Sequence, residues 1–133
     1  MIVRTLAGVR GTDRDVVAPT WRSRRLLLAG DGQPFSLHDT IIAAGTETTM
    51  WYRNHVEAVY CIDGNGKLED LDNGETYLLE AGTVYMLDGH ERHRVSAISD
   101  LRMVCVFSPP CSGAETHDQD GSYPLLSAGG PTS

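Results

Sequence analysis

The sequence predicts an all-β protein that folds as a single-domain jelly-roll barrel with one short helix. Three observations indicate this class. The chain has 133 residues, which fits one domain. Its apolar residues fall in many short, often alternating runs, and turn-forming pairs such as Asn-Gly and Asp-Gly separate those runs. Short strands at regular spacing are typical of a sandwich or barrel, and a closed barrel leaves no exposed strand edge.

The first half of the chain is expected to contain five strands and the helix. Residues 2–6 are an apolar run and predict the first strand, and residues 12–19 are the best helix candidate, a turn or two long. Apolar or alternating residues then predict strands at 24–28, 36–43, 48–52 and 58–62. The Asp31-Gly32 pair marks a turn between two of them.

The second half is expected to contain five more strands, at residues 67–71, 76–79, 83–87, 93–98 and 101–107. Hairpin turns are predicted at residues 63–66, at Asn73-Gly74 and at Asp88-Gly89. After Pro109-Pro110 the chain becomes polar and loses strand periodicity over residues 111–123, which alone would indicate a solvated tail. The expected organisation is therefore a barrel domain over residues 1–123 and a flexible, Gly/Pro-rich tail over residues 124–133.

Composition excludes several classes of partner. The net charge is −7 and the basic residues form no long cluster, which argues against nucleic acid. No apolar run approaches the roughly 18 residues of a membrane helix, and the N-terminus does not resemble a secretory leader, so we expect a cytoplasmic location and no membrane. The three cysteines have no Cys-x-x-Cys spacing, which argues against a disulfide framework or a structural zinc site.

Two glycine-framed motifs occupy the middle of the chain. The first runs from Gly45 to Gly64 and carries Trp51, Arg53 and Glu57; the second runs from Gly74 to Gly89 and carries Glu80, Gly82 and Tyr85. This frame resembles the two-part motif of the cupin superfamily, which implies a barrel. Of the usual cupin metal ligands only Glu57 is retained, because Trp51, Arg53 and Tyr85 stand where cupins carry histidines.

A different ligand set is nevertheless available. His93 follows the Tyr85 turn, and alternate residues of a barrel strand point inward, so Glu57, Tyr85 and His93 can converge on one internal point. A carboxylate, a phenolate and an imidazole form a mixed oxygen and nitrogen set that suits iron and leaves positions open for a substrate.

Two other readings stay open at this point. A metal-free ligand-binding or regulatory cupin is compatible with the lost histidines. A non-haem iron oxygenase is a second alternative, although such enzymes usually use two histidines and a carboxylate, which Tyr85 does not match.

The chain resembles the ectoine synthases in blocks that cover residues 1–124. They are Met1-Ile-Val-Arg-Thr-Leu6, Phe35-Ser-Leu-His38, Ala44-Gly-Thr-Glu-Thr48, Tyr52-Arg-Asn-His-Val-Glu57, Val59-Tyr-Cys-Ile62, Leu101-Arg-Met-Val-Cys-Val-Phe107 and Glu115-Thr-His-Asp-Gln-Asp-Gly121. The resemblance implies a cytoplasmic, homodimeric, Fe(II)-dependent hydro-lyase that cyclises N-gamma-acetyl-L-2,4-diaminobutyrate to ectoine, a compatible solute for osmotic stress. Ser108, Cys111 and Arg94 depart from the family pattern at positions outside the proposed ligands.

The resemblance also implies a set of site residues. The metal ligands fall on Glu57, Tyr85 and His93, and the proton-transfer candidates are Tyr52, Glu115 and His117. The substrate-binding positions fall on Trp21, Arg25, Thr40, His55, Cys105 and Phe107. Residues 111–123 are then expected to form a lid that brings Glu115 and His117 over the barrel. His38, His90 and Glu91 are expected at the surface or in turns.

Overall fold

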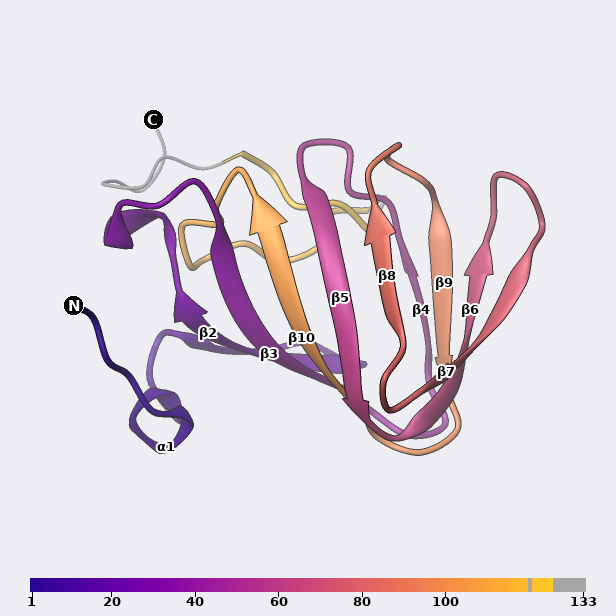
Figure 1. The fold of residues 1–133 in the computed structure, drawn as a ribbon, viewed down its shortest axis with the longest axis horizontal. Helices are drawn as coiled ribbons and strands as arrows, with labels where there is room; N and C mark the ends of the chain where they lie inside the picture. The colour runs from indigo at the N-terminus through magenta and orange to yellow at the C-terminus, as the bar shows by residue number, and fades with distance from the viewer. Residues whose placement is uncertain (120, 126–133) are drawn as a thin grey trace.

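Ten antiparallel strands form the framework of the described chain, residues 1–119 and 121–125, in this computed structural model (Figure 1). Two short helical segments accompany them, α1 (Leu6–Val9) and the 3-10 turn η1 (Ala29–Asp31). The strands are β1 (Asp15–Val17), β2 (Trp21–Leu27), β3 (Ser36–Ile42), β4 (Glu47–Met50), β5 (Val56–Asp63), β6 (Asn65–Asp70), β7 (Thr76–Glu80), β8 (Val84–Leu87), β9 (His93–Ala97) and β10 (Leu101–Ser108). No helix in these described ranges is long and apolar enough to cross a bilayer.

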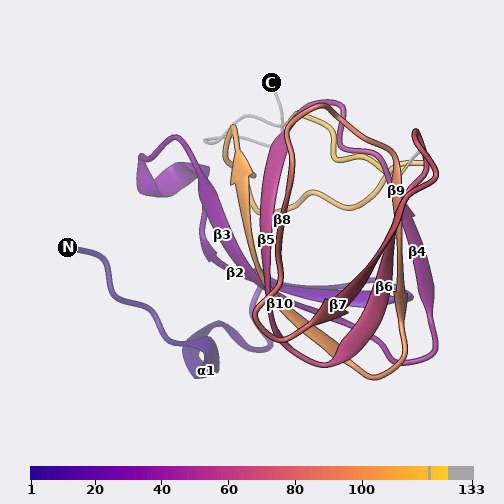
Figure 2. The ribbon, with the colours of Figure 1, turned by 45° about the vertical axis from the view of Figure 1, so that its right-hand side comes forward.

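The strands form two sheets that face each other around a common interior (Figure 2). The larger sheet has the order β1-β2-β3-β10-β5-β8 and the smaller one has the order β4-β9-β6-β7. This arrangement confirms the predicted all-β, single-domain barrel. Strands β8 and β7 lie at the edges of their sheets, so the barrel wall is interrupted between them.

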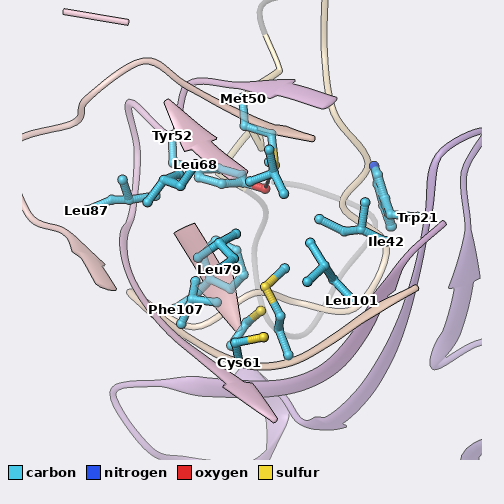
Figure 3. Close-up of a cluster of buried hydrophobic side chains, with 14 of the residues drawn as sticks. Trp21, Ile42, Met50, Tyr52, Cys61, Leu68, Leu79, Leu87, Leu101 and Phe107 are labelled. Atoms are coloured by element: carbon cyan, nitrogen blue, oxygen red, sulfur yellow. Dashed lines mark hydrogen bonds between the residues drawn. The ribbon is translucent and has the colours of Figure 1, made fainter. Parts of the chain in front are cut away.

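The interior is filled from the central strands because their residues alternate between the two faces. Burial alternates regularly along β5 and β10, which places Val59, Cys61, Met103, Cys105 and Phe107 inside. Figure 3 shows Phe107, Cys61, Leu79 and Leu101 meeting in this core, with Tyr52 and Trp21 toward its margin. Apolar side chains from both sheets therefore hold the two layers together.

The N-terminal region differs from the prediction. Residues 2–6 were expected to form a strand and residues 12–19 a helix, and both expectations are wrong. The hydroxyl of Thr5 accepts a hydrogen bond from the Gly8 amide at 3.0 Å, so the only α-helix of the described chain begins at Leu6. Asp15–Val17 instead forms strand β1 on the edge of β2, as β-branched valines favour.

The segment after β10 returns across the end of the barrel instead of leaving it (Figures 1 and 2). Its backbone joins the loop after β4 through Trp51, whose amide donates to the Gly121 carbonyl at 2.9 Å. The side chain of Asn54 donates to the Tyr123 carbonyl at 2.8 Å. Cys111, Glu115 and Tyr123 are buried, so residues 111–123 are not the solvated tail that their polarity alone indicated. Of the expected tail, residues 126–133 lie outside the described residues.

Candidate functional site

Most of the predicted site residues line one small cavity inside the barrel, of about 30 Å³. They come from strands of the larger sheet, from the loop after β4 and from the C-terminal segment. The predicted residues in its wall are Trp21, Thr40, Tyr52, Glu57, Tyr85, Cys105, Phe107 and His117. Residues separated by nearly the whole chain therefore meet at one point.

Strand register explains why these side chains face the cavity together. In β2 and β3, Trp21 lies opposite Ile42 and Arg25 lies opposite His38, so inward residues of one strand adjoin inward residues of the next. Strand β10 continues the row, with Cys105 opposite His38. A shift of one residue would turn the whole set outward.

The three predicted metal ligands come from adjacent or facing elements. Glu57 on β5 is 5% exposed, and Tyr85 on β8 shares the cavity wall with it. The rings of Tyr85 and His93 have centroids 6.5 Å apart. Among the described residues there is no group of three His, Cys, Asp or Glu side chains that could hold a metal, so a site here depends on the tyrosine as a donor.

The state of these groups fits a bound cation. Burial raises the pKa of Glu57 to about 8, since an isolated carboxylate is unfavourable in this interior. His93 is 1% exposed, its Nδ1 lies 3.1 Å from the Glu91 carbonyl, and its Nε2 has no hydrogen-bond partner among the described residues. A ring held through one nitrogen with the other nitrogen free is the usual arrangement of a metal-binding histidine.

Tyr52 and His117 form a hydrogen-bonded pair beside this trio. The Tyr52 hydroxyl and His117 Nε2 are 2.7 Å apart, and the Tyr52 ring lies 5.9 Å from that of His93. Burial lowers the pKa of His117 to about 4 and raises the pKa of Tyr52 well above its usual value. At neutral pH the pair is therefore a neutral imidazole next to a protonated phenol.

Arg25 and Glu115 form a second, charged pair behind the cavity. Arg25 Nη1 lies 3.8 Å from a Glu115 carboxylate oxygen and donates to the Gly113 carbonyl at 2.9 Å. Within the described chain, Arg25 Nη2 is buried and has no hydrogen-bond partner. The Glu115 carboxylate also accepts from the amides of Ser112 and Gly113, at 2.6 and 2.8 Å. The carboxylate is thus committed to its own turn and to Arg25.

The remaining predicted residue, His55, packs against the aromatic wall. Its ring contacts Phe107 at 5.7 Å and Tyr123 at 6.3 Å between centroids, and its Nδ1 is buried with no partner in the described part of the chain.

Two residues of this site were missed from the sequence. Tyr123 lines the cavity and its ring lies 4.8 Å from His117 and 5.0 Å from Tyr52. Only its aromatic character at the end of an otherwise polar segment could have drawn attention to it. His38 was expected at the surface, but it is fully buried on β3. His38 lies two residues before Thr40 in an alternating strand, so the sequence could have placed both side chains on the same, inward face.

The chain matches the protein family described as ectoine synthase over residues 1–127. It is 56% identical over 126 residues to the L-ectoine synthase of Thermobifida fusca, covering 95% of this chain and 94% of that protein. With the L-ectoine synthase of Halalkalibacterium halodurans it shares 52% identity over 126 residues, covering 95% and 98% of the two chains.

Solved structures give the same result. The crystal structure of ectoine synthase from P. lautus is 58% identical, covers 95% of this chain and 91% of that one, and superposes with a TM-score of 0.86. KdgF from Halomonas sp. is 21% identical, covers 71% and 84% of the two chains and has a TM-score of 0.60, a likeness of fold alone.

Proposed function

The chain belongs to the ectoine synthase family, and from this premise we propose how its barrel interior carries out the reaction. The enzyme is a hydro-lyase that forms ectoine by intramolecular dehydration of N-gamma-acetyl-L-2,4-diaminobutyrate. The α-amino nitrogen attacks the acetamide carbon and forms a C–N bond, the acetamide C–O bond breaks, and the oxygen leaves as water with two protons that the α-ammonium gives up. An amidine ring remains.

We assign Fe(II) to Glu57, Tyr85 and His93. The observation that supports this assignment is the buried His93 Nε2, which lacks a partner in the described chain next to the buried carboxyl of Glu57 and the partly buried phenol of Tyr85. A metal bound to these donors would polarise the acetamide oxygen as a Lewis acid. Glu57 and His93 are held by strands, so they need little rearrangement to bind it.

Tyr52 and His117 are proposed to move the protons. His117 is neutral at neutral pH and can accept the proton that the α-ammonium must lose before it attacks. The Tyr52 phenol stays protonated and can donate toward the departing oxygen, with His117 returning the proton across their 2.7 Å contact. Glu115, the third proton-transfer candidate, has both oxygens engaged by Ser112, Gly113 and Arg25 and is better placed to orient Arg25.

The remaining residues bind and fold the substrate. Arg25 Nη2 is a free donor suited to the substrate carboxylate. The side chains that would surround the rest of the molecule are Trp21, Thr40, His55, Cys105 and Phe107. Orientation contributes strongly here, because both reacting groups belong to one flexible molecule. Residues 111–123 are proposed to act as a lid that excludes water, since Tyr123 and His117 come from them and form part of the cavity wall.

We also propose that the enzyme is a cytoplasmic homodimer that makes a compatible solute under osmotic stress. The buried, unpaired Cys61, Cys105 and Cys111 suit a reducing compartment. Exposed apolar side chains gather on the edge strands β7 and β8, at Leu78, Val84 and Met86. The N-terminal arm, residues 1–5, exposes Met1, Ile2 and Val3. Docking of the arm of one copy on the β7–β8 edge of the other would cover both surfaces.

One assay tests the catalytic proposal. Purified, chelator-treated protein should make no ectoine from N-gamma-acetyl-L-2,4-diaminobutyrate. Added Fe(II) should restore turnover, and metal analysis should then find about one iron per chain, because the three ligands form one site. Full turnover by protein that metal analysis shows to be iron-free would overturn the metal assignment. It would leave the cyclisation itself in place.

A further inference from the structure

The side chain of His38 lies in a row of hydrogen bonds that the proposed chemistry leaves unused. Its Nδ1 is 3.2 Å from the Ser23 hydroxyl, and its Nε2 is 2.9 Å from the Ser36 hydroxyl. All three residues are at most 1% exposed. A buried polar group without a hydrogen-bond partner would destabilise the fold, so groups of this kind are normally hydrogen-bonded. In either neutral tautomer of His38, each ring nitrogen can pair with one of the two hydroxyl groups.

The row ends on two parts of the site. At one end, the Ser23 hydroxyl accepts from Arg25 Nε at 3.2 Å. At the other end, the Ser36 hydroxyl accepts from the Cys111 amide at 2.9 Å, where the C-terminal segment begins. The His38 ring is fixed from the side by Phe107, with centroids 5.0 Å apart. His38 therefore connects the guanidinium of Arg25 to the root of the proposed lid.

The contacts of Arg25 show what this connection controls. Its Nε is held by Ser23 and its Nη1 by the Gly113 carbonyl, which leaves Nη2 as the nitrogen with no partner in the described chain. A planar guanidinium fixed at two nitrogens has one orientation for the third. If the Ser23 contact is lost, the plane can rotate and its free donor no longer points in one direction.

We infer that His38, with Ser23 and Ser36, is a positioning residue that orients Arg25 for the substrate carboxylate and ties that orientation to the seated C-terminal segment. This inference rests on the proposed function, which assigns the carboxylate to Arg25. His38 does not touch the reacting atoms, so its effect must be passed through Arg25. The expected consequence is a selective loss of carboxylate recognition.

Two ligands separate this role from a general structural one. Ectoine carries the carboxylate, and 2-methyl-1,4,5,6-tetrahydropyrimidine is the same ring without it. Titration calorimetry on the iron-loaded wild-type protein should show tighter binding of ectoine. Ser23→Ala should raise the dissociation constant of ectoine about tenfold, which is the scale of one hydrogen bond to a charged group. The dissociation constant of the carboxylate-free ring should stay within about twofold of its wild-type value. His38→Gln, which keeps one donor and one acceptor, should lie between wild type and Ser23→Ala.

Thr48→Val is the matched control. It removes a partly buried hydroxyl contact of 2.7 Å with Thr20 that has no link to Arg25, so it should affect the binding of both ligands equally. Should His38→Gln fail to fold, Ser23→Ala decides alone, because it removes a single oxygen. Full discrimination between the ligands in Ser23→Ala would overturn the inference and leave the proposed function intact. Equal binding of both ligands by wild type would overturn the carboxylate assignment and the inference together.

Discussion

At the scale of single residues, Glu57 is 5% exposed, and this burial opposes the ionisation of its carboxyl group. A carboxyl group this deeply buried is stable when it is neutral or next to a cation, and burial raises its pKa to about 8. The unfolded chain ionises it near its ordinary value of 4.5. Between pH 4.5 and about pH 8, Glu57 of the metal-free protein therefore keeps its proton in the folded state and has lost it in the unfolded state. The free energy of unfolding falls as the pH rises through this range.

Replacing Glu57 by glutamine should remove this pH dependence. In metal-free protein the melting temperature of wild type should fall between pH 5 and pH 8, and that of Glu57→Gln should fall less, because an amide does not ionise. Differential scanning calorimetry of both proteins measures the difference. Iron content after reconstitution should drop in the variant at the same time. Parallel pH curves for the two proteins would contradict the assigned environment of Glu57.

The Tyr52–His117 pair gives a second prediction at this scale. Tyr52→Phe and His117→Gln should each lower turnover by about a hundredfold to ten-thousandfold, the usual range for one acid–base group, while iron content stays at the wild-type level. Initial rates of ectoine formation and metal analysis on the same preparations provide the test. Loss of iron in parallel with activity would show that these residues support the metal instead of moving protons.

At the residue scale, strand alternation could predict which side chains face the same interior, and their roles stay predictions. Glu57, Tyr85 and His93 could be grouped because alternate residues face one interior, and the structure brings them to adjoining positions. His38 could not be identified in this way. Its burial depends on hydrogen bonds to Ser23 on β2 and to Ser36, two residues earlier on its own strand. Serines at these positions form no sequence pattern that would indicate a buried histidine.

At the scale of elements, the C-terminal segment depends on a close backbone approach at Gly121. A Cβ added there would lie 2.4 Å from the Thr49 carbonyl oxygen and 2.8 Å from the Met50 Cα. Its φ of 75° is also a left-handed conformation that favours glycine. Only glycine at this point lets the segment lie against the end of β4.

Gly121→Ala should therefore displace the segment and lower turnover while the barrel keeps its iron. Gly11→Ala is the control, because Gly11 has a similar φ of 72° but an added Cβ would meet nothing within 4 Å. Both changes carry the same conformational penalty of roughly 1 kcal/mol, so the difference in turnover isolates the steric effect. Equal activities in the two variants would show that seating of the segment is not needed for catalysis.

The elements themselves were predictable where local pattern and tertiary pairing agree. Strands from β3 to β10 were expected within a few residues of their observed bounds, because alternation and Gly-containing turns act locally. The N-terminal region was not predictable. The valines of residues 15–17 favour a strand, but the segment also needs the free edge of β2 and the bond that Arg22 donates to Asp15 at 2.7 Å, and these contacts exist only in the folded chain.

At the scale of the whole molecule, the apolar β7–β8 edge and the N-terminal arm remain exposed in one chain. Val84 is 67% exposed and Val3 is 79% exposed. Both belong to the surfaces proposed to meet in the homodimer. A lysine at Val84 should place a charge in that interface, where its desolvation opposes association.

Val84→Lys should accordingly shift the protein from the mass of two chains toward that of one in light scattering at micromolar concentration. Val17→Lys is the control, since Val17 is 69% exposed on β1, at the opposite end of the larger sheet from β8. Deletion of residues 1–5 should have the same effect as Val84→Lys. A wild-type protein that scatters as a single chain would refute the dimer.

The volume of the internal cavity, about 30 Å³, has a kinetic consequence. A space of this size admits one or two water molecules but no acetylated amino acid. We therefore expect the cavity to widen when the substrate enters and again when the ring leaves, and we expect these openings to limit the residence time of ectoine. Added viscogen such as sucrose should then slow steady-state turnover more than the first turnover of preloaded enzyme.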